Sequence, residues 1–307
     1  MNISLFWQKI FFVTLGIVGV SWAAIFIRLC QQEVAQVTIG LSLLIAASRL
    51  LISTLILSPT YVNLKNIRAD SSPKAIFAAV GAGICLAFHF AGWISSLNFT
   101  SVAASVSLVT TNPLWVALLS WWFLGQKITR KTFVGITIAI FGSILVAFSD
   151  PDMTTGSNPV LGALLALLGS WFASGYILLG KIAQEKNLTT SQYVSIAYLT
   201  ATVCLFPLPL LMGNSYLNYS PAFYLYVFLM AIVSQIIGHT SINWCLKHFS
   251  PTTISILILI EPIISSLLAW WLFQEIPTDL VIGGSLIVII GVLISIVNFN
   301  FKMSWKK

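Results

Sequence analysis

Glu261 is the residue whose type and place could do the most chemistry, because it is a carboxylate inside a long apolar run and is followed by proline. Pro262 lacks an N–H and therefore frees a backbone carbonyl one turn earlier in a helix. A carboxyl group beside a broken helix can bind a cation or exchange a proton, since desolvation favours its protonated form. A second interpretation stays open, in which Glu261 only bonds to a neighbouring helix.

Two further runs carry polar residues at helical spacing. Gln235, His239 and Asn243 follow one another at intervals of four, so they share one helix face. His89 and Trp93 have the same spacing in an earlier run. Such faces are unfavourable in lipid and should line a wet cavity or form hydrogen bonds between helices. The two histidines could relay protons, or they could be neutral residues of the core.

Other candidates for a cavity lining are single residues in apolar runs. Arg49 must be paired or hydrated. It could have a structural role, or it could face an anionic group of the substrate or the Glu261 carboxylate. Trp22 and Trp171 each follow a serine and could present aromatic walls to a cation or a planar ligand. Polar residues before Pro113 complete the candidate lining: Thr111 and Asn112.

Composition requires that lipid, not water, surround the elements that position these residues. Of 307 residues, 58% are hydrophobic and 7% are charged, against about 25% charged in soluble domains. The net charge of +7 comes from scattered basic residues without a nucleic-acid motif, which excludes nucleic acid as the expected partner. No nucleotide-binding, hydrolase or metal-ligand motif is present, so we expect no cofactor, no metal and no enzyme.

Ten continuous apolar runs are long enough to cross the bilayer as helices. Their approximate limits are Phe11–Ile27, Val37–Leu57, Ala75–Leu97, Ala103–Leu124, Phe133–Phe148, Val160–Leu179, Tyr193–Met212, Phe223–Leu246, Thr253–Phe273 and Leu280–Val297. If both termini are cytoplasmic, thirteen of the fifteen basic residues fall inside, all but Arg28 and Arg49. The outside loops then hold acidic residues instead, as the positive-inside rule requires: Glu33, Asp150, Asp152, Glu275 and Asp279.

The second half of the chain repeats the first at a constant offset of 149 residues. Pro113 matches Pro262, and the Trp121–Trp122 pair matches Trp270–Trp271. The offset also sets Asn112 opposite Glu261, which makes any role of that carboxylate asymmetric. Residues 1–149 and 150–307 are therefore interpreted as two copies of one five-helix unit. Five is odd, so the copies must enter the membrane from opposite sides, as in transporters that work by alternating access.

The segment "TNPLWVALLSWWFLGQKIT" and its counterpart "IEPIISSLLAWWLFQEIPT", each followed by a G-x₆-G helix, resemble the two EamA repeats of the drug/metabolite transporter superfamily. "SWA" in the first helix, Arg49 in "AASRLL" and the "SVAAS" stretch fit the same pattern over the whole chain. Gln126 departs from it, since family members often carry glutamate there, whereas Glu275 at the matching place keeps it. The resemblance implies a ten-helix basket around a central cavity, with the fifth and tenth helices peripheral.

The resulting expectation is an all-α integral membrane protein with ten helices in a 5+5 inverted-topology repeat. Its expected function is secondary transport of small metabolites such as amino acids across the cytoplasmic membrane, with export suggested by the resemblance and proton coupling left open. Alternatives from other classes are a passive facilitator or channel, an integral membrane enzyme and a scaffold. Nothing in the sequence sets the oligomeric state.

Overall fold

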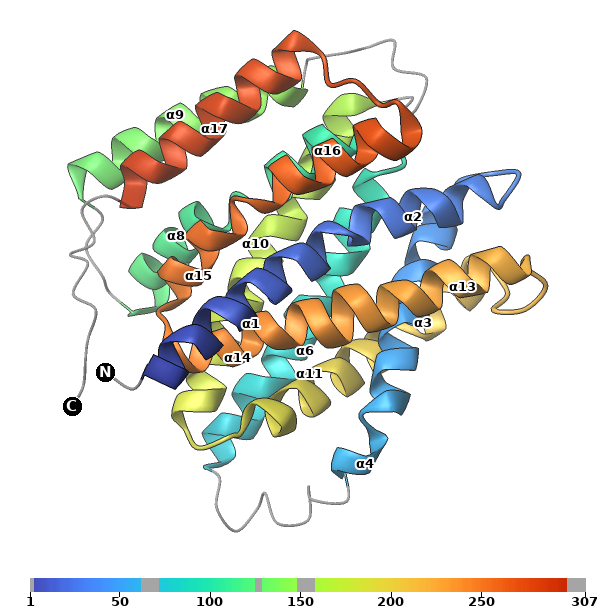
Figure 1. The fold of residues 1–307 in the computed structure, drawn as a ribbon, viewed down its shortest axis with the longest axis horizontal. Coiled ribbons are helices and arrows are strands. Elements are labelled where there is room, and N and C mark those ends of the chain that lie inside the picture. The colour runs from blue at the N-terminus through green and yellow to red at the C-terminus, as the bar shows by residue number, and fades with distance from the viewer. Residues whose placement is uncertain (1–2, 62–71, 125–128, 148–157, 297–307) are drawn as a thin grey trace.

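The computed structural model describes residues 3–61, 72–124, 129–147 and 158–296, and every regular element in these ranges is a helix (Figure 1). Gln126 lies outside these ranges. So do several charged residues that were used to predict the topology: Lys65, Arg68, Lys127, Asp150, Asp152, Lys302, Lys306 and Lys307. The first half contains α1 (Ile3–Ser21), α2 (Ala23–Gln32), α3 (Ile39–Ile56), α4 (Ser58–Tyr61), α6 (Pro73–Ser96), α7 (Val102–Val109), α8 (Asn112–Leu124) and α9 (Arg130–Ala147).

The second half contains α10 (Pro159–Glu185), α11 (Thr190–Leu205), α12 (Pro207–Leu211), α13 (Pro221–Leu229), the π-helix η2 (Met230–His239), α14 (Thr240–His248), α15 (Pro251–Ile258), α16 (Glu261–Phe273) and α17 (Asp279–Ile296). Adding 149 to the bounds of α7, α8 and α9 gives the bounds of α15, α16 and α17. The offset seen in the sequence is thus repeated in where these helices begin and end.

Eight helical stretches in the described residues are long and apolar enough to span a membrane. They are Leu5–Gln32, Ile39–Ile56, Pro73–Ser96, Val102–Leu119, Pro159–Glu185, Thr190–Leu211, Pro221–His248 and Pro251–Phe273. The other two expected spans coincide with shorter apolar helices, Phe133–Leu145 and Asp279–Ile294. The membrane class and the all-helical fold are therefore confirmed, and the full number of ten spans stays a prediction.

Local sequence explains where the long helices begin. Ser72, Ser220 and Ser250 each accept a hydrogen bond from a backbone N–H of the first turn, and each is followed by proline. Asn158 before Pro159 has the same arrangement. A short polar cap satisfies a free N–H of the first turn, and proline at the first helical position needs no partner for its nitrogen.

The helices α9 and α17 lie side by side at one edge of the bundle (Figure 1). Their glycines allow backbone contact, because a Cβ on Gly291 would lie 2.5 Å from the Ala139 nitrogen and one on Gly142 would lie 2.7 Å from the Val288 nitrogen. The G-x₆-G pattern of the two copies therefore serves to pack these two matching helices against each other. The main core lies elsewhere, among α2, α3, α6, α10, α11 and the helices around η2.

Candidate functional site

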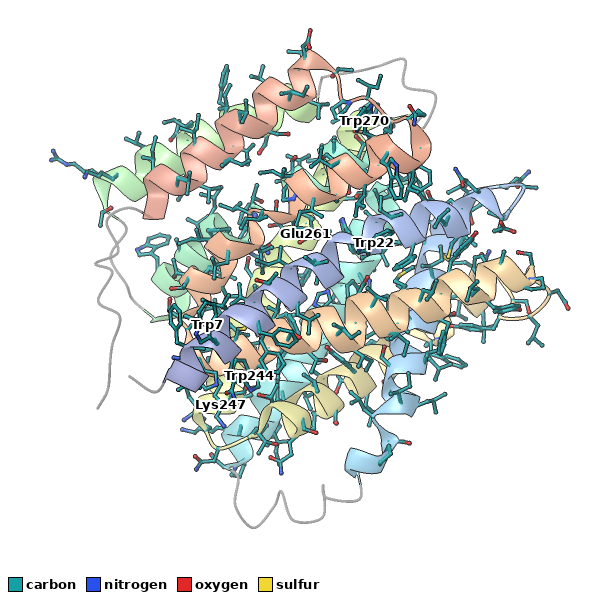
Figure 2. All side chains as sticks on the ribbon, viewed as in Figure 1. Trp7, Trp22, Trp244, Lys247, Glu261 and Trp270 are labelled. Atoms are coloured by element: carbon teal, nitrogen blue, oxygen red, sulfur yellow. The ribbon has the colours of Figure 1, made fainter. Side chains whose placement is uncertain are left out.

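A small cavity of about 50 Å³ lies in the middle of the bundle, where Figure 2 places Glu261 and Trp22 between the two ends of the molecule. Helices α6 and α10, the π-helix η2 and the junctions within three interrupted spans surround it. Its lining combines one carboxyl group, two imidazoles, an indole, a phenol and an amide with aliphatic residues: Val20, Ala23, His89, Trp93, Val109, Thr110, Asn112, Ala173, Tyr176, Ile177, His239, Ile242, Ile258 and Glu261.

Two broken helices bring Asn112 and Glu261 to this cavity. Helix α7 ends at Val109 and α8 begins at Asn112, while α15 ends at Ile258 and α16 begins at Glu261. Proline is the second residue of both α8 and α16, and its missing N–H prevents the bond that would continue the preceding helix. The expected helix break beside Glu261 is thus present, and its counterpart beside Asn112 is present as well.

The Asn112 amide fills the gap that its own proline leaves. With its nitrogen facing the surrounding acceptors, it donates to the Val109 carbonyl at 2.9 Å and to the Ser170 hydroxyl at 2.9 Å. Val109 is the residue whose carbonyl Pro113 cannot bond in a continuous helix. Asn112 therefore satisfies a backbone acceptor that would otherwise stay unpaired next to the cavity.

Glu261 occupies the equivalent place in the second half with a different chemical group. It is 8% exposed, and among the described residues no hydrogen bond reaches its carboxylate oxygens. Arg49 is close enough to interact with it electrostatically, yet the two form no ion pair. As the first residue of α16, Glu261 also lies at the positive end of a helix dipole. The carboxyl group is thus buried, borders the cavity and has no hydrogen-bond partner among the described residues.

His89 and His239 both line the cavity, and their rings lie edge to face with centroids 6.5 Å apart. His89 Nδ1 lies 3.0 Å from the Gly169 carbonyl. A carbonyl oxygen can only accept, so this nitrogen carries the proton and Nε2 remains the basic site. Trp93 stacks on the His89 ring at 5.8 Å. The two histidines that the sequence singled out are therefore neighbours in the lining of one small cavity.

The π-helix η2 sets the direction of Gln235 and His239. Short π segments are rare and often occur at functional sites. The Gln235 carbonyl accepts the Thr240 backbone N–H that closes the wider turn, and it also accepts bonds from the Tyr198 and Thr240 hydroxyls, both at 3.3 Å. Gln235 itself points away from the cavity, and its Oε1 accepts a 2.7 Å bond from Arg49 Nη2.

Arg49 is completely buried but does not line the cavity. Its guanidinium lies over the Phe90 ring at 4.2 Å, and Nε and Nη1 have no hydrogen-bond partner. A fixed positive charge behind the cavity wall with two free donors is unusual, because buried charges are normally paired. Arg49 therefore keeps a positive potential behind the histidines and opposite Glu261.

Tyr176 lines the cavity, whereas Asn243 lies outside the lining and contacts the Tyr176 hydroxyl. The Asn243 amide donates to the Tyr176 hydroxyl, and Asn243 Oδ1 has no partner. Tyr176 lines the cavity and was not among the predicted site residues. A signal for it existed, since Ser170, Ser174 and Tyr176 interrupt an otherwise apolar run.

Three other predicted residues lie outside the cavity lining. Trp22 and Trp171 are half-buried. Trp22 stacks on the Phe26 ring, and Trp171 contacts the Phe172 ring edge to face. Thr111 turns the other way from Thr110, bonds to the Ser170 hydroxyl at 3.0 Å and faces a separate apolar pocket beside Trp115. The break between α7 and α8 explains this, since Thr110 and Thr111 belong to no helix and point to opposite sides.

Within the described residues, no group of three or more His, Cys, Asp and Glu side chains could hold a metal ion. The cavity therefore offers proton-exchanging and hydrogen-bonding groups, with a single carboxyl group as its one acid. These groups suit reversible binding of a small polar solute, and the broken helices are elements that can change their angle with little loss of hydrogen bonding.

Known proteins with similar sequences are transporters. The uncharacterized transporter YdfC of Bacillus subtilis is 24% identical over 222 residues, which cover 70% of each chain. The pseudopaline exporter CntI of Pseudomonas aeruginosa is 20% identical over 209 residues, covering 68% of this chain and 71% of the exporter. An uncharacterized transporter of Archaeoglobus fulgidus is 26% identical over 255 residues, covering 81% and 87%.

The fold is also found in a solved crystal structure that covers 92% of this chain and 96% of its own, with a TM-score of 0.60 at 14% identity. The model of the EamA-like transporter family matches residues 7–148 and again residues 160–297. These two matches together span most of the chain. The protein is accordingly a member of the EamA-like transporter family.

Proposed function

We propose that the protein is a secondary transporter that exports small metabolites with an amino group, such as amino acids, in exchange for protons. The observation that carries this proposal is the placement of Glu261 and Asn112 at the starts of matching half-helices on one central cavity. The carboxylate would accept a substrate ammonium group or a proton, but not both at once. Competition of this kind couples the two movements.

Asn112 suggests how protonation acts on the helix break. Its amide donates to the freed Val109 carbonyl, and Ile258 is the equivalent residue before Glu261. A protonated carboxyl group has an O–H that can donate in the same way, whereas a carboxylate has no donor. Protonation of Glu261 would therefore tie α15 to α16 as Asn112 ties α7 to α8, and substrate binding would release the tie.

The proposed mechanism is alternating access by a 5+5 inverted repeat with both termini in the cytoplasm. Support comes from the matching helix bounds, the double family match and the contact between the equivalent helices α9 and α17. The reversed charge after the fourth and ninth spans supports opposite orientation. A cavity of about 50 Å³ holds only one or two waters, so the two halves must move apart to admit a substrate.

The direction of transport is inferred from the pseudopaline exporter among the relatives. Phosphorylated substrates fit poorly, since Arg49 is the one arginine or lysine side chain buried near the cavity in the described residues and it lies behind the wall. An ammonium group facing the single carboxyl group and the aromatic rings fits better.

Counterflow in proteoliposomes tests this function. Vesicles loaded with one unlabelled amino acid or metabolite of a panel should take up the same labelled compound, with saturation and with stimulation by a pH gradient. Flux that rises linearly with concentration and shows no counterflow would indicate a channel instead. Chemical turnover of a panel compound in detergent, where no compartments exist, would indicate an enzyme.

A further inference from the structure

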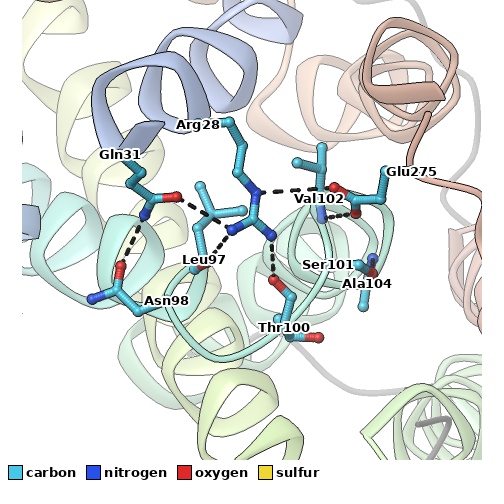
Figure 3. Close-up of polar contacts among 9 residues, drawn as sticks. All are labelled: Arg28, Gln31, Leu97, Asn98, Thr100, Ser101, Val102, Ala104 and Glu275. Atoms are coloured by element: carbon cyan, nitrogen blue, oxygen red, sulfur yellow. Dashed lines mark hydrogen bonds and ion pairs between the residues drawn. The ribbon is translucent and has the colours of Figure 1, made fainter. Parts of the chain in front are cut away.

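Arg28 joins three separate parts of the chain at one end of the molecule (Figure 3). It lies on α2, and its guanidinium donates to the carbonyls of Leu97 at 2.7 Å and Thr100 at 2.8 Å. Its Nε lies 3.9 Å from the Glu275 carboxylate. The other oxygen of Glu275 accepts a 2.6 Å bond from the Val102 backbone N–H. Both charged side chains are almost buried, 12% and 10% exposed.

A second cation makes the equivalent contacts in the second half. Lys181 on α10 donates to the carbonyls of Leu246 at 2.8 Å and Phe249 at 3.3 Å. These are the residues that the 149-residue offset assigns to Leu97 and Thr100. Each half therefore has one cation on its first span. That cation binds the two equivalent carbonyls at the end of the third span. The two sites are called the Arg28 clasp (Arg28, Leu97, Thr100, Val102 and Glu275) and the Lys181 clasp (Lys181, Leu246 and Phe249).

The clasps close opposite ends of the central cavity. Helix α2 runs from Ala23 at the cavity to Arg28, and α7 and α16 also lead from the cavity towards the Arg28 clasp. Helix α10 runs from Ile177 at the cavity to Lys181, and α14 runs from Ile242 to the Leu246 carbonyl. In Figure 1, α2 and α16 end at the right of the molecule, and α14 lies at the lower left.

Among the described residues, the Arg28 clasp is the one of the two clasps that contains an ion pair between the halves. Glu275 belongs to the second half, while Arg28 and Val102 belong to the first. In the sequence, the 149-residue offset pairs Glu275 with Gln126, which has no charge and lies outside the described residues, and it pairs Val102 with Pro251, which has no N–H. The pair of a carboxylate and a backbone N–H is therefore not repeated in the sequence of the other half. At that end the halves meet instead through Lys9 over the Phe249 ring and Phe12 against Trp244.

The Arg28 end has a further bridge between the halves. The Ser220 hydroxyl donates to the Glu33 carboxylate at 2.6 Å, joining the end of α2 to the start of α13. Hydrogen bonds that involve a charged group are stronger than neutral ones. The Ser220–Glu33 bond is exposed, whereas the bonds of the Arg28 clasp are almost buried and therefore less weakened by water. The charged bridges therefore hold the Arg28 end shut more firmly than ring contacts hold the opposite end.

We propose that the Arg28 and Lys181 clasps are the two gates of the transport cavity, and that Glu275 biases the resting protein towards a closed Arg28 end. The proposal rests on alternating access as the proposed function. The Lys181 gate, which lacks a carboxylate from the other half, opens first.

Cysteine accessibility in membrane vesicles tests the gates without requiring a substrate. Ala23 lines the cavity, so Ala23→Cys reports whether an impermeant maleimide enters from either side. The four native cysteines are followed by mass spectrometry of the labelled peptides, with the parent chain as control. Labelling of Ala23→Cys is measured in right-side-out and inside-out vesicles, alone and combined with each gate variant.

Glu275→Gln should raise labelling of Ala23→Cys about tenfold from the Arg28 side and leave the Lys181 side unchanged or slower. Lys181→Gln should raise labelling of Ala23→Cys from the Lys181 side and leave the Arg28 side unchanged or slower. Val102→Pro is a milder variant that keeps the carboxylate and removes only its N–H partner, with Pro251 as natural precedent at the equivalent helix start. It should give a smaller increase on the Arg28 side.

The gate proposal fails if Glu275→Gln leaves labelling unchanged on both sides, or raises it equally on both as a loosened fold would. Side-specific labelling without counterflow of any panel compound would leave the gates standing and count against the transport function. Counterflow with no change of labelling in any variant would support the transport function and count against the gates.

Discussion

Asn112 and Glu261 occupy one structural position in two chemical forms. Both begin a half-helix, both precede a proline, and both face the same cavity. An amide always carries its donor, whereas a carboxyl group carries one only when protonated. One half of the molecule therefore has a permanent tie across its helix break, and in the proposed mechanism the other half has a tie that depends on a proton.

Replacing Glu261 with glutamine makes the second break resemble the first. Glu261→Gln should abolish the stimulation of uptake by a pH gradient and keep labelled counterflow within about a few-fold of the parent, because the amide cannot exchange a proton. Measurement of both activities in the same proteoliposomes separates coupling from binding. Gradient-driven uptake equal to that of the parent chain would exclude Glu261 as the coupling residue.

Sequence reasoning located much of the cavity at this scale. Glu261, His89, Trp93, His239 and Asn112 were predicted and do line it. Polar side chains in apolar runs are costly in lipid, so they mark the interior reliably. The same reasoning could not separate residues that face the cavity from those one layer behind it, such as Arg49. Helical periodicity shows which residues share a helix face, but it does not show what that face packs against.

At the scale of elements, interruptions matter more than the helices themselves. Breaks after Val109 and Ile258 and the π-helix η2 all border the cavity. Pro113 and Pro262 predicted the two breaks from the sequence, because the effect of proline on the backbone is local. No residue pattern in the sequence predicted η2, whose Gln235 carbonyl also accepts a bond from the Tyr198 hydroxyl of another helix.

The α9–α17 contact permits a test with a matched control in one helix. A Cβ at Gly291 would meet the backbone of α9, whereas a Cβ at Gly283 has nothing within 4 Å. Alanine favours a helix over glycine by about 1 kcal/mol at either place, but crowding at Gly291 should cost about 1–3 kcal/mol. Gly291→Ala should therefore lower the melting temperature in detergent, and Gly283→Ala should leave it equal or higher. Equal melting temperatures for the two variants would show that α9 and α17 need no backbone contact.

At the scale of the whole molecule, the repeat was readable because its offset holds without insertion. Helix bounds in the second half follow those of the first from α7 to α9. The sequence could not show which helices touch, since packing of α9 on α17 or α6 on α10 depends on three-dimensional arrangement. Nor could it show the clasps, whose acceptors are backbone carbonyls present at every residue.

Opposite orientation of the halves predicts opposite sides for two exposed, equivalent helix starts. Lys131 in the first turn of α9 and Asp279 at the start of α17 are both exposed. Lys131→Cys should react with an impermeant maleimide only in inside-out vesicles, and Asp279→Cys only in right-side-out vesicles. Reaction of both from the same side would rule out the inverted repeat.

The small size of the central cavity has a consequence for the cell that carries the protein. About 50 Å³ leaves no room for a continuous file of water, so ions have no hydrated path through the closed protein. Idle copies would thus insulate the membrane as well as the surrounding lipid does. Many copies could be kept ready without short-circuiting the voltage on which their work depends.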